Sequence, residues 1–179
     1  MVSKEEVKEL KLQYGKTQRY GAHFICASLL IWIFIFAVSF MNLTQYYKNM
    51  LSLYSSALLV PLALLFSKLL GIKFSDKENP LNTAGLVFAL NQMLYLVIVI
   101  LVWFIKPELM IASYAMVVGA HFLPYSWLYD SAIYRVFSIV ITIGVFVLTI
   151  TGHSTLIPLV MIVADLVMIV LFLTKTRKR

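Results

Sequence analysis

Residues 83–105, TAGLVFALNQMLYLVIVILVWFI, decide the fold: the run carries no charged residue and ends at Lys106-Pro107. An α-helix rises 1.5 Å per residue, so a run of this length extends for about 35 Å, slightly more than the hydrocarbon core of a bilayer. Backbone N–H and C=O groups find no water inside lipid and must therefore bond within the segment. The run is predicted to be a transmembrane helix.

Further apolar runs of similar length fill most of the remaining chain, which predicts an all-α polytopic membrane protein with six transmembrane helices. We place the spans at 22–41, 52–72, 83–105, 108–129, 131–150 and 155–174. The composition agrees, because the 179 residues are 61% hydrophobic and only 13% charged, about half the charged fraction of a soluble domain. Six spans leave no room for a soluble core, so residues 1–179 are predicted to form a single integral membrane domain.

The segment before the first span, residues 1–20, is predicted to be a short amphipathic helix. Ser3 and Glu6 match a capping box, in which each residue bonds the backbone N–H of the other. An apolar stripe of three residues follows, Val7, Leu10 and Tyr14. Such a helix would lie on the membrane surface; a solvated charged arm is the alternative.

The basic residues between the spans are distributed unequally over the two sides of the predicted topology. Thirteen fall on one side, namely Lys4, Lys8, Lys11, Lys16, Arg19, Lys68, Lys73, Lys77, Arg135, Lys175, Arg177, Lys178 and Arg179. Two fall on the other side, Lys48 and Lys106. Because cytoplasmic loops carry the excess of Lys and Arg, both termini are predicted to be cytoplasmic, in a cell inner membrane.

The net charge of +7 lies beside the membrane in this topology. Anionic lipid headgroups are the natural partners of such charge. We therefore predict membrane lipids as partners, and no nucleic acid.

Asp165 is the clearest candidate for function, because it lies near the middle of the sixth span and is the only carboxylate that we place deep in the bilayer. Ionisable groups at membrane depth are costly and commonly functional. The residue predicts a proton or cation site, or a catalytic acid. The alternative is a carboxyl that hydrogen-bonds a neighbouring helix and only holds the bundle together.

His121 is the second candidate. It lies in the fourth span and shares one helical face with Tyr114, Val118 and Tyr125, because residues three, four and seven apart lie on the same side of a helix. The histidine is either a ligand-binding or catalytic group or a packed residue that hydrogen-bonds a neighbour.

Asn91 and Gln92 are adjacent in the third span, and Tyr95 shares a face with Asn91. Side-chain amides also bridge membrane helices without any further function. Arg135 begins the fifth span; it either snorkels to the headgroups or pairs with an aspartate or an anionic ligand.

These polar residues fall in the cytoplasmic half or at the midplane of four spans, which favours a polar cavity open to the cytoplasm. The predicted ligand-binding residues are Asn91, Gln92, Tyr95, His121, Tyr125, Arg135 and Asp165. The sequence contains no Gly-rich phosphate loop, no HExxH or GxSxG motif and no acidic cluster for Mg²⁺. We therefore predict no cofactor and no metal, and assign no catalytic residue.

Two stretches resemble an uncharacterised family of small six-helix multipass bacterial membrane proteins of unknown function. The first runs from Asn79-Pro80-Leu81-Asn82 into Asn91-Gln92-Met93-Leu94-Tyr95. The second runs from Gly119-Ala120-His121 into Leu123-Pro124-Tyr125 and Trp127-Leu128-Tyr129. The resemblance implies a bacterial cytoplasmic membrane and transfers no activity.

Three functions are consistent with these features. The preferred one is the binding or transport of a small molecule or ion through the polar cavity; six short helices enclose little volume, so a homo-oligomer is compatible with it. An intramembrane enzyme acting on a lipid or hydrophobic substrate would need a lateral opening to lipid. A non-catalytic regulatory or scaffolding protein would have a dry core with every polar atom paired.

Overall fold

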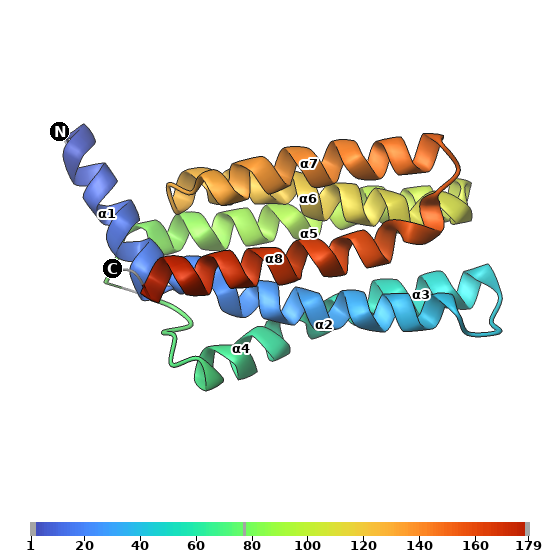
Figure 1. The fold of residues 1–179 in the computed structure, drawn as a ribbon, viewed down its shortest axis with the longest axis horizontal. Coiled ribbons are helices and arrows are strands. Elements are labelled where there is room, and N and C mark those ends of the chain that lie inside the picture. The colour runs from blue at the N-terminus through green and yellow to red at the C-terminus, as the bar shows by residue number, and fades with distance from the viewer. Residues whose placement is uncertain (1–2, 77, 178–179) are drawn as a thin grey trace.

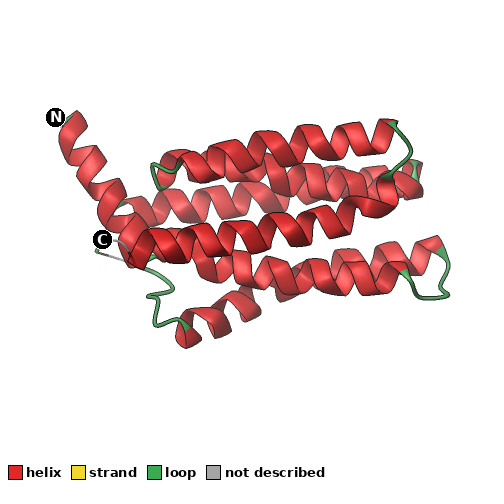
Figure 2. Cartoon of the chain, in the orientation of Figure 1, coloured by secondary structure: helices red, strands yellow, loops and turns green. Residues whose placement is uncertain are grey.

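The computed structural model describes residues 3–76 and 78–177. Within these ranges the chain forms helices joined by loops, with no strand (Figure 2), so the predicted all-α fold is confirmed. Three of the predicted cytoplasmic cations, Lys77, Lys178 and Arg179, lie outside the described residues.

The main helices are α1 (Lys4–Thr17), α2 (Ala22–Ser39), α3 (Gln45–Ser55), α4 (Leu59–Leu69), α5 (Leu81–Ile105), α6 (Met110–Leu128), α7 (Ala132–Ile150) and α8 (Ile157–Arg177). Six segments are long and apolar enough to cross a membrane: Arg19–Ser39, Gln45–Leu69, Leu81–Ile105, Pro107–Leu128, Ala132–Ile150 and Ser154–Thr176. All six predicted spans are therefore present, and the chain is a multipass membrane protein.

The second span differs most from its prediction, since it begins at Gln45 rather than at residue 52. Its first part, α3, is polar, so hydropathy alone does not indicate it. The polar groups are satisfied inside the protein: the buried Asn49 donates from Nδ2 to the Pro107 carbonyl at 2.8 Å and accepts from Gln45 Nε2 at 2.8 Å. Because these bonds satisfy its buried polar groups, the polar helix α3 can form the first part of the same span as the apolar helix α4.

The helices are arranged around two extensively packed pairs, α2 with α8 and α6 with α7 (Figure 1). Helix α4 packs against α2, and α5 packs against α6. The helix α1 and the end of α8 lie at one end of the bundle, which we call the terminal end; the opposite end is the distal end. At the terminal end α4 diverges from the other helices (Figure 1).

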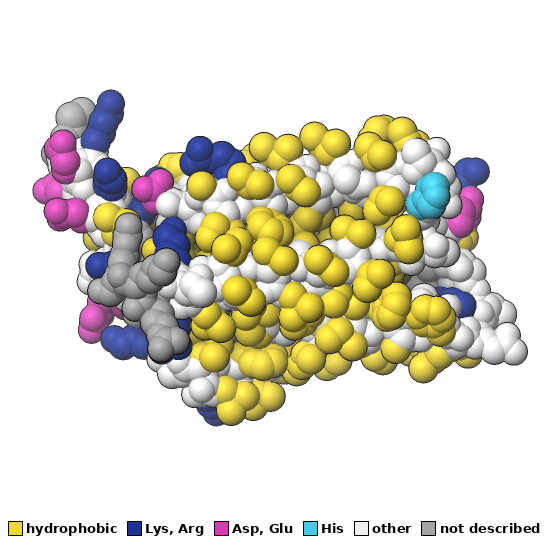
Figure 3. All heavy atoms as spheres, viewed as in Figure 1, with side chains coloured by type: hydrophobic (Ala, Val, Ile, Leu, Met, Phe, Trp, Pro, Cys, Tyr) yellow, Lys and Arg dark blue, Asp and Glu magenta, His cyan; other side chains and the backbone are white. Residues whose placement is uncertain are grey.

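Apolar and basic side chains on the surface are also distributed unequally between the middle and the ends of the bundle. Apolar side chains cover the middle of the visible face, and most Lys and Arg side chains gather at the terminal end (Figure 3). Lys48 and Lys106 belong to distal segments. The basic residues thus separate by end as the sequence predicts.

Helix α1 docks on the terminal end through its apolar stripe. The predicted capping box is present, since Ser3 Oγ accepts from the Glu6 N–H and the Glu6 carboxylate accepts from the Ser3 N–H. Tyr14 is buried and stacks on Tyr129, with ring centroids 5.7 Å apart. Burial raises the pKa of the Tyr14 phenol, and the nearby Asp76 carboxylate raises it further.

Helices α6 and α7 approach closely at Gly119. A Cβ atom at this position would lie 2.7 Å from Ile141 Cγ2 and 2.9 Å from Thr142 Oγ1, so only glycine fits without displacement. This close contact fixes the part of α6 that carries His121, half a turn further along the chain.

Candidate functional site

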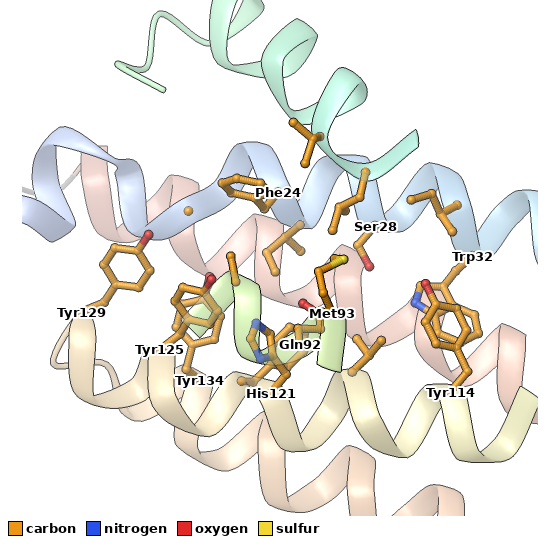
Figure 4. Close-up of a pocket in the computed structure, with 18 residues that line it drawn as sticks. Phe24, Ser28, Trp32, Gln92, Met93, Tyr114, His121, Tyr125, Tyr129 and Tyr134 are labelled. Carbon is orange, nitrogen blue, oxygen red and sulfur yellow. The ribbon is translucent and has the colours of Figure 1, made fainter. Parts of the chain in front are cut away.

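A cavity of about 110 Å³ lies between α2, α4, α5 and α6, on the terminal side of the bundle centre (Figure 4). We call it the terminal cavity. Seven of the 18 residues that line it carry aromatic rings: Phe24, Trp32, Tyr114, Phe122, Tyr125, Tyr129 and Tyr134. Its polar side chains outside these rings are Ser28, Gln92 and His121.

The helical face predicted around His121 forms one wall of this cavity. Tyr114, Val118, His121 and Tyr125 all line it. His121 is buried, and its ring meets the Tyr125 ring edge-on at 5.0 Å between centroids. Its Nδ1 atom is buried with no hydrogen-bond partner among the described residues. One proton position of the imidazole is thus left without a protein partner.

Only one of the two adjacent amide side chains of α5 faces the cavity. Gln92 lines it, whereas the half-buried Asn91 does not. Successive residues of a helix point about 100° apart, so both amides cannot face the same space. Tyr95 shares the face of Asn91 and is exposed towards the lipid side. Arg135, at the start of α7, is also exposed and does not line the cavity.

Asp165 lies directly behind the cavity wall rather than in it. The buried face of α8 presents a stripe of fully buried residues, Ile157, Met161, Asp165, Met168 and Phe172. The carboxyl occupies the middle of this stripe, where an apolar side chain would pack. Both of its oxygens are buried without a hydrogen bond of good geometry among the described residues.

Ser28 connects Asp165 to the cavity. The Ser28 side chain lies close to the carboxyl and also lines the terminal cavity. In Figure 4 the Ser28 hydroxyl is directed towards the space between Gln92 and Trp32. The buried carboxyl is therefore separated from the cavity by a single hydroxyl.

Several cavity residues were not predicted from the sequence, above all Phe24, Ser28 and Trp32. They are spaced by four residues and form one face of α2. The available signal was Ser28, a polar residue in an otherwise apolar stretch of the first span.

A second cavity opens at the distal end, with a volume of about 310 Å³; we call it the distal vestibule. Its polar lining includes Ser39, Gln45, Lys48, Ser52, Glu108, Ser154 and Thr155. Towards the bundle centre it ends at Ile35 of α2 and Ile111 of α6.

The barrier between the two cavities is thin. Ile35 and Trp32 are one turn apart on α2, and Ile111 and Tyr114 are one turn apart on α6, about 5 Å of helix in each case. Trp32 and Tyr114 stack across the barrier with ring centroids 5.3 Å apart. One layer of side chains thus separates the terminal cavity from the distal vestibule.

In the part of the chain that the structure describes, no group of three or more His, Cys, Asp or Glu side chains is placed to hold a metal ion.

Six apolar helices with a cavity at membrane depth define a polytopic helical membrane protein. Residues 7–175 match a family of unknown function (DUF7010), and the chain belongs to this family. No curated protein and no solved structure matches the chain.

Proposed function

We propose that the protein is a carrier that binds a small molecule in the terminal cavity and passes it across the membrane. The observation that supports this most is the thin barrier between the terminal cavity and the distal vestibule. A carrier needs a central site with one closed side and one accessible side, which exchange. Separation of Trp32 from Tyr114 would join the terminal cavity to the distal vestibule.

The unpaired polar groups support binding rather than scaffolding. A scaffold is expected to pair its buried polar atoms, because each unsatisfied group in a low-dielectric interior is costly. His121 Nδ1 and both Asp165 oxygens lack such partners among the described residues. Buried polar atoms of Gln18, His23, Ser131 and Thr142 also lack partners among the described residues and do not line the cavity. The support for a ligand therefore comes from the placement of His121 in the cavity wall and of Asp165 behind it.

The terminal end is the cytoplasmic end in this proposal, and the membrane is a cell inner membrane. The excess of basic residues at that end supports the orientation, since positively charged loops are retained in the cytoplasm. Anionic lipid headgroups would be their partners.

An intramembrane enzyme acting on a lipid or hydrophobic substrate is the second candidate. It is favoured by one observation: Val60 of α4 and Met93 of α5 line the cavity and are also exposed on the outer surface. The cavity therefore reaches the lipid-facing side between these helices. In this case His121 would act as the acid or base.

Thiol accessibility at Ser28 distinguishes these functions. The single cysteine is first removed by Cys26→Ser, and Ser28→Cys is then treated with a membrane-impermeant methanethiosulfonate in sealed vesicles of either orientation. A carrier exposes position 28 alternately, so reaction is expected from both sides. Ser39→Cys, at an exposed position of the distal vestibule, serves as a control that reacts from the distal side, and the exposed Ser75→Cys as one that reacts from the terminal side.

Reaction of Ser28→Cys from the terminal side alone would contradict transport and favour the enzyme. Protection from both sides, with both controls reactive, would also contradict transport.

A further inference from the structure

The walls of the terminal cavity have the chemistry of a cation site. Seven aromatic side chains line it, and the face of an aromatic ring carries negative charge that attracts a cation within about 6 Å of the ring centre. The molecule already pairs cations with rings elsewhere, since Lys11 Nζ lies 3.6 Å from the Trp127 ring centre and Lys175 Nζ lies 4.1 Å from that of Tyr20.

The buried carboxyl supplies the negative charge that an aromatic cavity alone lacks. The groups that face Asp165 are Ser28 and Cys26 on α2, Tyr114 on α6 and Tyr134 on α7. None of them is cationic, and no described Lys, Arg or His forms an ion pair with Asp165. A carboxylate so buried must be neutralised by a proton or by a cation from outside the chain.

Asp165 and the aromatic wall meet at the same surface. Ser28, Tyr114 and Tyr134 each line the cavity, and each lies within electrostatic range of the Asp165 carboxyl. A cation in the cavity would therefore be within reach of the carboxyl's field across one layer of atoms. Low dielectric strengthens such an attraction.

The size of the cavity limits the ligand to a small one. A volume of about 110 Å³ corresponds to roughly four water molecules at about 30 Å³ each. This accommodates an alkylammonium group with a few carbon atoms, and the opening between Val60 and Met93 admits an apolar substituent that extends towards the lipid.

We propose that the terminal cavity binds a small organic cation, a quaternary or protonated amine, whose charge is held by the aromatic rings and the Asp165 carboxylate. This proposal rests on the cavity being the binding site of the proposed carrier. In the empty protein a proton neutralises Asp165; when the cation enters, that proton leaves to the solvent. One proton is thus released for each cation bound.

The test compares choline with 3,3-dimethylbutan-1-ol, a neutral molecule of nearly the same shape, by isothermal titration calorimetry of the full chain in nanodiscs. Choline is expected to bind at least about tenfold more tightly, in keeping with the strength of desolvated cation–π contacts. Its affinity should rise with pH, and buffers of different ionisation enthalpy should report proton release. The neutral probe should show neither effect.

Two variants assign the effect to named groups. Asp165→Asn keeps the side-chain shape and should reduce choline affinity at least about tenfold and abolish proton release, with unchanged affinity for the neutral probe. Tyr114→Leu should weaken choline selectively, whereas Trp127→Leu, which removes a ring outside the cavity, should not. Melting temperatures show whether each variant is folded.

Equal binding of the two probes, no binding of either, or unchanged choline binding and proton release in folded Asp165→Asn would overturn the cation site. Two-sided reactivity of Ser28→Cys would be unaffected by these results. The calorimetry therefore tests the cation specificity, and the thiol labelling tests transport, independently of each other.

Discussion

The terminal cavity and the distal vestibule lie between some of the same helices yet differ in almost every property. The vestibule is larger, about 310 Å³ against 110 Å³, and is lined by Ser, Thr, Gln, Lys and Glu side chains. The terminal cavity is lined by aromatic rings and borders a buried carboxyl. The vestibule resembles an entrance, where polar groups stay hydrated, and the terminal cavity resembles a binding site, where they are desolvated.

The two ends of the bundle also close differently. At the terminal end stacked rings pack beneath the cavity: Tyr129 stacks on Tyr14 at 5.7 Å and on Tyr134 at 5.7 Å. Tyr134 donates its hydroxyl hydrogen to the Tyr20 carbonyl at 2.7 Å. The distal side of the terminal cavity is closed by the Trp32–Tyr114 pair, with Ile35 and Ile111 on the vestibule side of it. The difference indicates that this pair is the easier one to separate.

Removal of the Trp32 ring from the barrier should have the largest effect on stability and on the accessibility of position 28. Trp32 is almost fully buried, so Trp32→Ala should cost about 3–5 kcal/mol of unfolding free energy and join the two cavities. Ser28→Cys in this background should react rapidly and continuously from the distal side. Trp127→Ala, at an exposed ring, is the control; equal losses in the two variants would contradict the barrier.

A substitution in the tight contact between α6 and α7 should have the second-largest effect on stability. Gly119→Ala places a methyl 2.7 Å from Ile141 Cγ2 and should cost about 1–3 kcal/mol through overpacking. Gly144→Ala on α7 meets nothing within 4 Å and should be neutral or stabilise by up to about 1 kcal/mol. Thermal unfolding measures both. Similar melting temperatures would show that α6 and α7 are not in close contact at Gly119.

The docking of α1 should show the smallest effect, and only in alkali. The pKa of Tyr14 is raised in the docked state by burial and by Asp76. Below about pH 10 both docked and undocked forms carry a neutral phenol; above it the undocked form ionises first, so docking weakens as pH rises. Anisotropy of a dye attached through Lys8→Cys, in the Cys26→Ser background, should fall above this pH.

Tyr14→Phe is the matched control for that titration. It should leave docking at pH 7 nearly unchanged, because a phenylalanine ring can keep the stacking on Tyr129 and only the phenol oxygen is lost. It should also reduce the alkaline loss of anisotropy. An identical titration of the two proteins would contradict the role of Tyr14.

Most of the fold follows from the sequence, because span length and hydropathy are local properties. The exception, the early start at Gln45, depends on the hydrogen bond that Asn49 donates to the distant Pro107 carbonyl and on the one that Asn49 accepts from Gln45. Such a partner is invisible to a local hydropathy count. The capping box of α1 was predictable for the opposite reason, since Ser3 and Glu6 satisfy each other within one turn.

The candidate site follows only partly from the sequence. The face of His121 and Tyr125 was correctly described, because one helix determines it. Which of Asn91 and Gln92 faces the cavity depends on how α5 is rotated about its axis, and an apolar sequence on all sides does not specify that rotation. The relation of Ser28 to Asp165 arises from the packing of α2 against α8, which no single span contains.

Opening of the Trp32–Tyr114 barrier should change the distance between two spin labels at the distal vestibule, and double electron–electron resonance measures that distance. Nitroxide labels are attached through Ser39→Cys and Thr155→Cys, two exposed positions of the vestibule, in the Cys26→Ser background. We expect two label-to-label distances in proteoliposomes, one with the barrier closed and one with it open. Their proportions should change when choline is added. A single distance, identical with and without choline while Ser28→Cys stays unreactive from the distal side, would contradict it.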